Sequence, residues 1–85
     1  MNTVTVRYFA AIREALGTGS ETLTTTAPTL AALRDELIAR GQPWAAALAR
    51  GKAVRLALNQ EMVADESAPL PGGAEVAFFP PVTGG

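Results

Sequence analysis

The residues with the clearest chemical potential stand at the end of the chain, which reads EVAFFPPVTGG over residues 75–85. Gly84 and Gly85 carry no side chain, so the terminal carboxylate could enter a channel that would exclude any larger residue. Pro80 and Pro81 come before them. Because proline holds φ at about −65° and donates no ladder hydrogen bond, this pair must end a strand and leave the chain extended, with a reach of about 20 Å. The pattern favours a stiff neck that holds the carboxylate of Gly85 outside the fold over a terminus that merely frays.

Composition excludes most other chemistry. The 85 residues contain no Cys and no His, which rules out thiol nucleophiles, imidazole bases, disulfides and the usual zinc ligand sets. A net charge of −1 and a pI of about 5.2 argue against a phosphate-binding surface, so we expect no nucleic-acid partner. No apolar run approaches the roughly 18 residues of a membrane helix, and Arg7 interrupts the first apolar stretch. We therefore expect no membrane partner and a cytoplasmic location.

Two charged patterns carry less weight than the terminus. Gly51-Lys52 lacks the upstream glycine and the following Ser or Thr of a phosphate loop. Glu61, Asp65 and Glu66 lie close in sequence and suggest divalent metal ligands, but a solvated acidic edge is the better interpretation. We expect no metal site and no cofactor bound by this chain. Any chemistry is predicted to belong to the chain terminus.

Alternating apolar residues predict strands at residues 3–9, 21–26, 54–59 and 75–79, with a short return strand at 62–63. The side chains expected to face inward are Val4, Val6, Tyr8, Val54, Leu56, Leu58, Val76 and Phe78. The second strand is rich in threonine and is predicted to pair antiparallel with the first. The first and last strands are strongly apolar on one face, so we expect them side by side and parallel at the centre of the sheet.

Helical spacing and capping residues predict two helices and a helical turn. A short helix is expected at residues 10–16, closed by Gly17, and a helical turn at residues 43–49. The main helix begins after an N-cap at Thr29 and ends at Gly41. The side chains expected to pack inward from these segments are Leu30, Leu33, Leu37, Ile38, Ile12, Ala15, Leu16, Trp44 and Leu48. The side chains expected on the outside of the main helix are Arg34, Asp35 and Glu36.

This order of elements defines a fold class. A mixed sheet packed on one main helix is a two-layer α+β domain, and parallel strands at its centre make it a β-grasp, the ubiquitin-like roll. We expect one small domain at residues 1–79, followed by an extended tail at residues 80–85.

Several short motifs resemble the small subunits of molybdopterin synthase, a family of ubiquitin-like sulfur carriers. In chain order these motifs are Tyr8-Phe9-Ala10, Arg13-Glu14, Gly17, Leu33-Arg34, Leu58-Asn59-Gln60 and the ending at residues 75–85. They span nearly the whole chain, and the ending is the most specific of them. The sequence Pro-Gly-Gly-Ala at residues 71–74 departs from the acidic-glycine-acidic turn common in the family, which affects only that turn.

The resemblance implies a function for the terminus. In this family a ubiquitin-activator-like adenylyltransferase uses ATP to adenylate the terminal glycine, here Gly85 next to Gly84, and the adenylate is converted to a thiocarboxylate. The large synthase subunit, expected in a heterotetramer with the carrier, then receives the sulfur for a cyclic pyranopterin monophosphate. The carrier is a non-catalytic sulfur donor, and the catalytic residues are expected on the large subunit. Activation is needed because a terminal carboxyl with a pKa of about 3.5 is ionised at neutral pH and is a poor electrophile.

The resemblance also implies docking through an apolar patch beside the tail. Alternation turns Phe79 away from the core, and Met62 follows the Asn59-Gln60 turn, so we expect both on the same face. The predicted partner-binding residues are Met62, Phe79, Pro80, Pro81, Val82 and Thr83.

Three other functions remain open. A sulfur carrier for thiazole synthesis also ends in Gly-Gly but is shorter, and the FFPPV sequence before the end argues against it. A ubiquitin-like protein modifier would share the same end and attach to lysines. A plain interaction domain would keep an unreactive terminus.

Overall fold

The computed structural model describes residues 2–81, which form a five-stranded sheet in the order β2-β1-β5-β3-β4. The strands are β1 (Asn2–Tyr8), β2 (Ser20–Thr25), β3 (Arg55–Leu58), β4 (Glu61–Val63) and β5 (Glu75–Phe79). The helices are α1 (Ala10–Leu16), α2 (Leu30–Ile38) and α3 (Trp44–Ala47). These bounds agree with the predicted ones to within two residues, except that α2 ends at Ile38 with a C-cap at Ala39, whereas the predicted main helix ends at Gly41.

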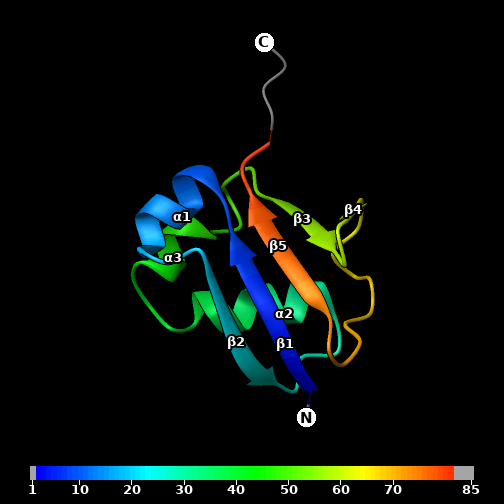
Figure 1. The fold of residues 1–85 in the computed structure, drawn as a ribbon. Coiled ribbons are helices and arrows are strands. Elements are labelled where there is room, and N and C mark those ends of the chain that lie inside the picture. The colour runs from blue at the N-terminus through cyan, green and yellow to red at the C-terminus, as the bar shows by residue number, and fades with distance from the viewer. Residues whose placement is uncertain (1, 82–85) are drawn as a thin grey trace.

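The centre of the sheet is the parallel pair β1 and β5 (Figure 1). Val6 lies opposite Val76 and Tyr8 opposite Phe78, and the rings of the latter two stack with centroids 6.1 Å apart. The pairs β1–β2, β3–β5 and β3–β4 are antiparallel. Pairing the two most apolar strands buries both of their inward faces, which confirms the predicted mixed sheet and β-grasp arrangement.

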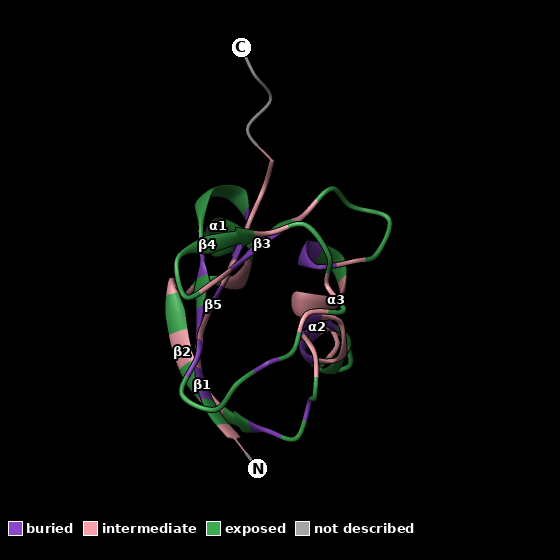
Figure 2. Ribbon diagram, turned by 90° about the vertical axis from the view of Figure 1, so that its right-hand side faces the viewer, coloured by how far each residue is buried: buried purple, intermediate pink, exposed green. Residues whose placement is uncertain are grey.

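Helix α2 covers one face of the sheet, with α3 beside it (Figure 2). The hydroxyl oxygen of Thr29 accepts a hydrogen bond from the backbone N–H of Ala32 at 3.2 Å, as expected of an N-cap. Leu30, Leu33 and Leu37 of α2 are fully buried against the inner face of the sheet. The other large, fully buried side chains are Val4, Val6, Tyr8, Leu48, Val76 and Phe78. The core therefore lies between α2 and the central strands.

The expectation that Arg34 lies on the outside of the main helix is wrong. Its side chain is buried, at 3% exposure, under the segment that follows α3. Its Nε and Nη2 donate to the carbonyl oxygens of Leu48 and Ala49, both at 2.9 Å, and its Nη1 donates to Glu66 at 2.7 Å. A guanidinium has enough fixed donors to satisfy all three acceptors, which makes its burial tolerable. Arg34 thus connects α2 to two distant segments.

The prediction of a solvated acidic edge is partly wrong, because one of its three residues pairs with the buried Arg34. Glu66 is half-buried and bridges Arg34 and Arg50, the second at 2.6 Å. Hydrogen bonding to Asp35, and then to Glu66, raises the pKa of Arg50. Asp65 is exposed as expected, and a hydrogen bond from the backbone N–H of Ser67 lowers the pKa of its carboxyl. Of the three acidic residues, Glu66 therefore connects parts of the fold, whereas Glu61 and Asp65 are exposed.

Three smaller expectations also need correction. Ala15 is exposed, because from the short helix α1 only Ile12 is buried, with Leu16 packing beside the core. Val54 and Leu58 pack against the core but remain half-buried; Val54 comes just before β3, and Leu58 is the last residue of that strand. The end of α1 agrees with the prediction. Gly17 ends α1 in the left-handed conformation, with φ of 74°.

Candidate docking site at the root of the tail

A shallow apolar groove lies on the outer face of the sheet, where β5 ends. Its floor is the cross-strand pair of Ala77 on β5 and Ala57 on β3, and Met62 on β4 lies next to Ala57 in the same row. Phe79 and Phe9 border the groove at the end from which the tail leaves. Small residues in the floor and large ones at the border make a hollow in an otherwise pleated surface.

The groove contains large apolar side chains that are exposed to solvent, which is unusual for residues of this kind. Within residues 2–81, the large hydrophobic side chains that are strongly exposed are Phe9, at 41%, and Met62, at 63%. Phe79 is half-buried and points to this face, as the alternation along β5 predicts. Exposed apolar side chains that gather in one place typically mark an interaction surface.

Phe9 is the residue that the sequence interpretation missed. Its ring meets that of Phe79 edge to face, with centroids 6.5 Å apart and planes at 85°, which is a favourable geometry for two aromatic rings. Its backbone N–H donates to Phe78 at 3.1 Å, so the ladder between β1 and β5 continues one residue past β1. The signal was present in the sequence, because residue 9 continues the exposed face of residues 3, 5 and 7.

The position of Met62 depends on a tight turn between β3 and β4. Asn59 and Gln60 both have positive φ, 50° and 71°, as the two central residues of a type I′ hairpin turn require. The side-chain oxygen of Asn59 accepts from the backbone N–H of Glu75 at 2.9 Å, and its own N–H donates to the Glu75 carbonyl at 2.8 Å. These two bonds attach the hairpin to β5 and so hold Met62 on the same face as Phe79.

Charged side chains border the groove without closing it. The guanidinium carbon of Arg7 lies 5.8 Å from the ring centre of Phe9, and its Nη1 lies 3.5 Å from a carboxylate oxygen of Glu75. Both partners of this ion pair are substantially exposed to solvent, so the pair contributes little to stability. A partner protein could displace it at low cost.

The tail leaves the sheet directly beside this groove. Pro80 and Pro81 follow β5 and are half-buried, and neither belongs to a strand. The remaining predicted site residues, Val82, Thr83, Gly84 and Gly85, lie outside the described residues. The structure brings Phe79, Met62 and Pro80 to one end of the molecule, and their role in binding stays a prediction.

The described residues offer little that could hold a metal ion. Between residues 2 and 81, no group of three or more acidic side chains comes close enough to bind one. In the same part of the chain, no helix has the length and apolar character needed to span a bilayer.

A β-grasp domain with an apolar groove at the root of its C-terminal tail belongs to the class of ubiquitin-like proteins. The model of the ThiS family matches residues 6–85. The molybdopterin synthase sulfur carrier subunit of Escherichia coli is 45% identical over 82 residues, covering 96% of this chain and 99% of that protein. The protein of the same name from Haemophilus influenzae is 44% identical over 80 residues, covering 94% and 96%. This chain belongs to the ThiS family.

The fold is also similar to that of a protein solved together with a second subunit. In a complex of subunits 1 and 2 of molybdopterin-converting factor from Helicobacter pylori, one chain matches with a TM-score of 0.67 and 25% identity. The match covers 98% of this chain and 99% of that one. The likeness therefore includes the whole domain.

Proposed function

We propose that this chain is the sulfur-carrier subunit of a molybdopterin synthase. The observation that carries the proposal is the near full-length relationship to the sulfur carrier subunit of Escherichia coli, at 45% identity. The groove beside the tail supports it, because a carrier must dock on its partners at the place where its reactive end departs.

The reaction takes place at the carboxyl carbon of Gly85. The carboxylate attacks the α-phosphorus of ATP in an activating adenylyltransferase and releases pyrophosphate, which leaves an acyl-adenylate. A sulfur donor then displaces AMP to give a thiocarboxylate. Its sulfur bonds to a cyclic pyranopterin monophosphate held by the large synthase subunit, and water cleaves the acyl–sulfur bond, which restores the carboxylate of Gly85. The carrier binds no cofactor in this scheme, since ATP belongs to the activating partner.

The side-chain composition suits a chain that carries an activated acyl group. An acyl-adenylate is open to attack by thiolates, imidazoles and amines. This sequence has no Cys and no His, and Lys52 is its only lysine, whereas its other basic residues are arginines. The guanidinium of arginine stays protonated and is a poor nucleophile. The activated terminus therefore meets few competing nucleophiles on its own chain.

Both partners are proposed to use the groove bordered by Phe9, Phe79 and Met62. A protein that receives the tail must approach the neck at Pro80 and Pro81, and the groove adjoins that neck. The stiff neck lowers the conformational entropy that the tail loses on threading into a channel. Because the activating enzyme and the large subunit would cover the same surface, the two complexes exclude each other. The assembly with the large subunit is expected to be a heterotetramer.

We expect Phe79→Ala and Phe9→Ala to weaken binding to both partners by about tenfold or more, and Met62→Ala to weaken it less. Aromatic anchors at the centre of an interface dominate its energy, whereas an exposed thioether adapts its packing. The free energy of unfolding should fall by less than about 1.5 kcal/mol, because none of the three is buried in the core. Titration calorimetry with each purified partner, beside urea unfolding, measures both quantities. Met62→Leu, which keeps an apolar side chain, is the matched control. Unchanged affinities for both aromatic variants would show that neither partner binds at the groove.

The proposed chemistry is tested by intact mass spectrometry. After incubation with the activating enzyme, ATP and a sulfur source, the chain should become heavier by the difference between one sulfur and one oxygen atom. Adding the large subunit and the pterin substrate should reverse this change and produce molybdopterin. A reaction without ATP is the control. If the mass gain appears but no molybdopterin forms, the thiazole-type carrier is favoured. Covalent conjugates on lysines of other proteins would indicate a protein modifier.

A further inference from the structure

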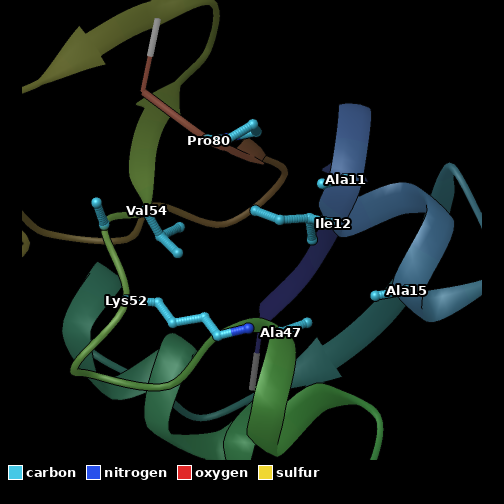
Figure 3. A pocket seen from close by; sticks show the side chains of 8 residues that line it. Ala11, Ile12, Ala15, Ala47, Lys52, Val54 and Pro80 are labelled. Carbon is cyan, nitrogen blue, oxygen red and sulfur yellow. The ribbon is translucent and has the colours of Figure 1, made fainter. Parts of the chain in front are cut away.

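A second apolar hollow, the neck cleft, lies beside the tail and is separate from the groove. It has a volume of about 150 Å³ and is lined mainly by Ala11 and Ala15 of α1, Ala47 of α3, Val54, Lys52 and Pro80 (Figure 3). A cavity of roughly this size can hold a benzene molecule, so the neck cleft has room for one branched aliphatic side chain. The cleft is open to solvent, and its alanines leave it unfilled.

The neck cleft and the groove adjoin consecutive residues of the chain. Phe79 lines the groove, and Pro80, the first residue of the tail, lines the neck cleft. A partner that surrounds the tail to reach Gly85 must therefore cover the neck cleft as well as the groove. This continuity is the first reason to assign the neck cleft to a protein that also covers the groove.

The charge of the neck cleft is the second reason. Lys52 extends along the cleft toward Ala47 of α3 (Figure 3), and none of the described residues that line the cleft carries a carboxylate. Within residues 2–81, the Lys52 ammonium makes no ion pair and no hydrogen bond, whereas Arg7, Arg34, Arg40 and Arg50 are each paired with an acidic residue. Arg13 and Arg55 also make no ion pair there, but neither lines the cleft. The charge of Lys52 therefore stays available to a ligand. A ligand that carries a negative charge next to its apolar part would complement this cleft best.

We infer that the neck cleft is a second docking point for the protein that receives the tail. It takes an aliphatic side chain of the large synthase subunit, and Lys52 pairs with a carboxylate of that subunit beside it. The inference rests on the proposed function, because it assumes a partner that encloses the tail. The tail of the same chain is the less suitable occupant, since two consecutive prolines at positions 80 and 81 oppose a sharp return toward α1.

The test compares four variants in titration calorimetry against the purified large subunit. Lys52→Glu should weaken binding about tenfold or more, because it places like charges opposite each other, and Lys52→Arg should stay within about threefold. Ala15→Leu should also weaken binding about tenfold, because it fills the cleft from an exposed position without entering the core. Arg13→Glu is the matched control. Arg13 lies on α1 outside the neck cleft, and this substitution changes the charge by the same amount as Lys52→Glu. The affinity of this variant for the large subunit should stay within about twofold of the wild-type value.

The outcomes separate this inference from the proposed function. If the wild-type chain binds the large subunit and both Lys52→Glu and Ala15→Leu bind as well as it does, the neck cleft is not a docking point, although the carrier function stands. Equal losses for Lys52→Glu and Arg13→Glu would show a general effect of charge and would also overturn the inference.

Tighter binding by Ala15→Leu would indicate that the tail itself occupies the cleft, which would likewise overturn the inference. Self-association of the wild type that Ala15→Leu abolishes would assign the cleft to a second copy. If the wild type does not bind at all, the proposed function fails. Urea unfolding of each variant excludes loss of folding as the cause.

Discussion

Deleting Gly85, or extending the chain beyond it with a C-terminal tag, is expected to abolish sulfur transfer. In the proposed reaction the atom that is adenylated and then carries sulfur is the carboxyl carbon of Gly85. Deletion leaves the new carboxylate about 3.3 Å short of that position, and a misplacement of about 1 Å already costs roughly a hundredfold in rate. A tag is more severe, because it converts the carboxylate into an amide that has no free oxygen to attack ATP. We expect no molybdopterin above background from either variant.

The measurement is a reconstituted synthase assay, with intact mass spectrometry of the carrier as a second readout. A chain tagged at its N-terminus is the control for the presence of a tag. Urea unfolding should give the same midpoint for all variants, because β5, the last strand, ends at Phe79 and the core lies within the domain. Full activity of a chain with a C-terminal tag would contradict the assignment of Gly85 as the reacting residue.

Replacing Arg34 by Ala is expected to cost about 3–5 kcal/mol of folding free energy, a large part of the total for a small domain. The substitution leaves the carbonyl oxygens of Leu48 and Ala49 without the donors that they now have, and it removes the buried partner of Glu66. Arg34→Lys should recover only part of the loss, because an ammonium cannot reach three acceptors in the fixed arrangement of a guanidinium.

Urea unfolding measures this cost directly, and Arg13→Ala is the matched control. Arg13 is exposed and makes no ion pair within the described residues, so its replacement should change stability by less than about 0.5 kcal/mol. A loss below about 1 kcal/mol for Arg34→Ala would mean that the guanidinium does not hold α2 to the segment after α3. The groove at the other face should be unaffected, so partner affinity at a temperature where the variant is folded should stay near that of the wild type.

Local patterns in the sequence determined most of the fold. Alternation identified the strands and the two that lie parallel at the centre, because only a strand places every second side chain on one face. Thr29 and Gly17 marked helix boundaries through the hydrogen bonds and the left-handed conformation that such positions need. The same alternation placed Phe79 on the outer face beside the tail.

The tertiary structure decided features that depend on segments far apart in the sequence. Arg34 follows Leu33 on the helix and has a side chain that usually faces water, and nothing near it in sequence indicates that the segment after α3 will cover it. Phe9 and Phe79 meet only because β1 and β5 pair in parallel at a particular register, although the two residues are separated by most of the chain. Lys52 and Pro80 likewise share the neck cleft only because α1, α3 and the segment before β3 gather at the end of β5. Periodicity reports which face of its own element a side chain occupies, whereas the packing of elements decides what covers that face.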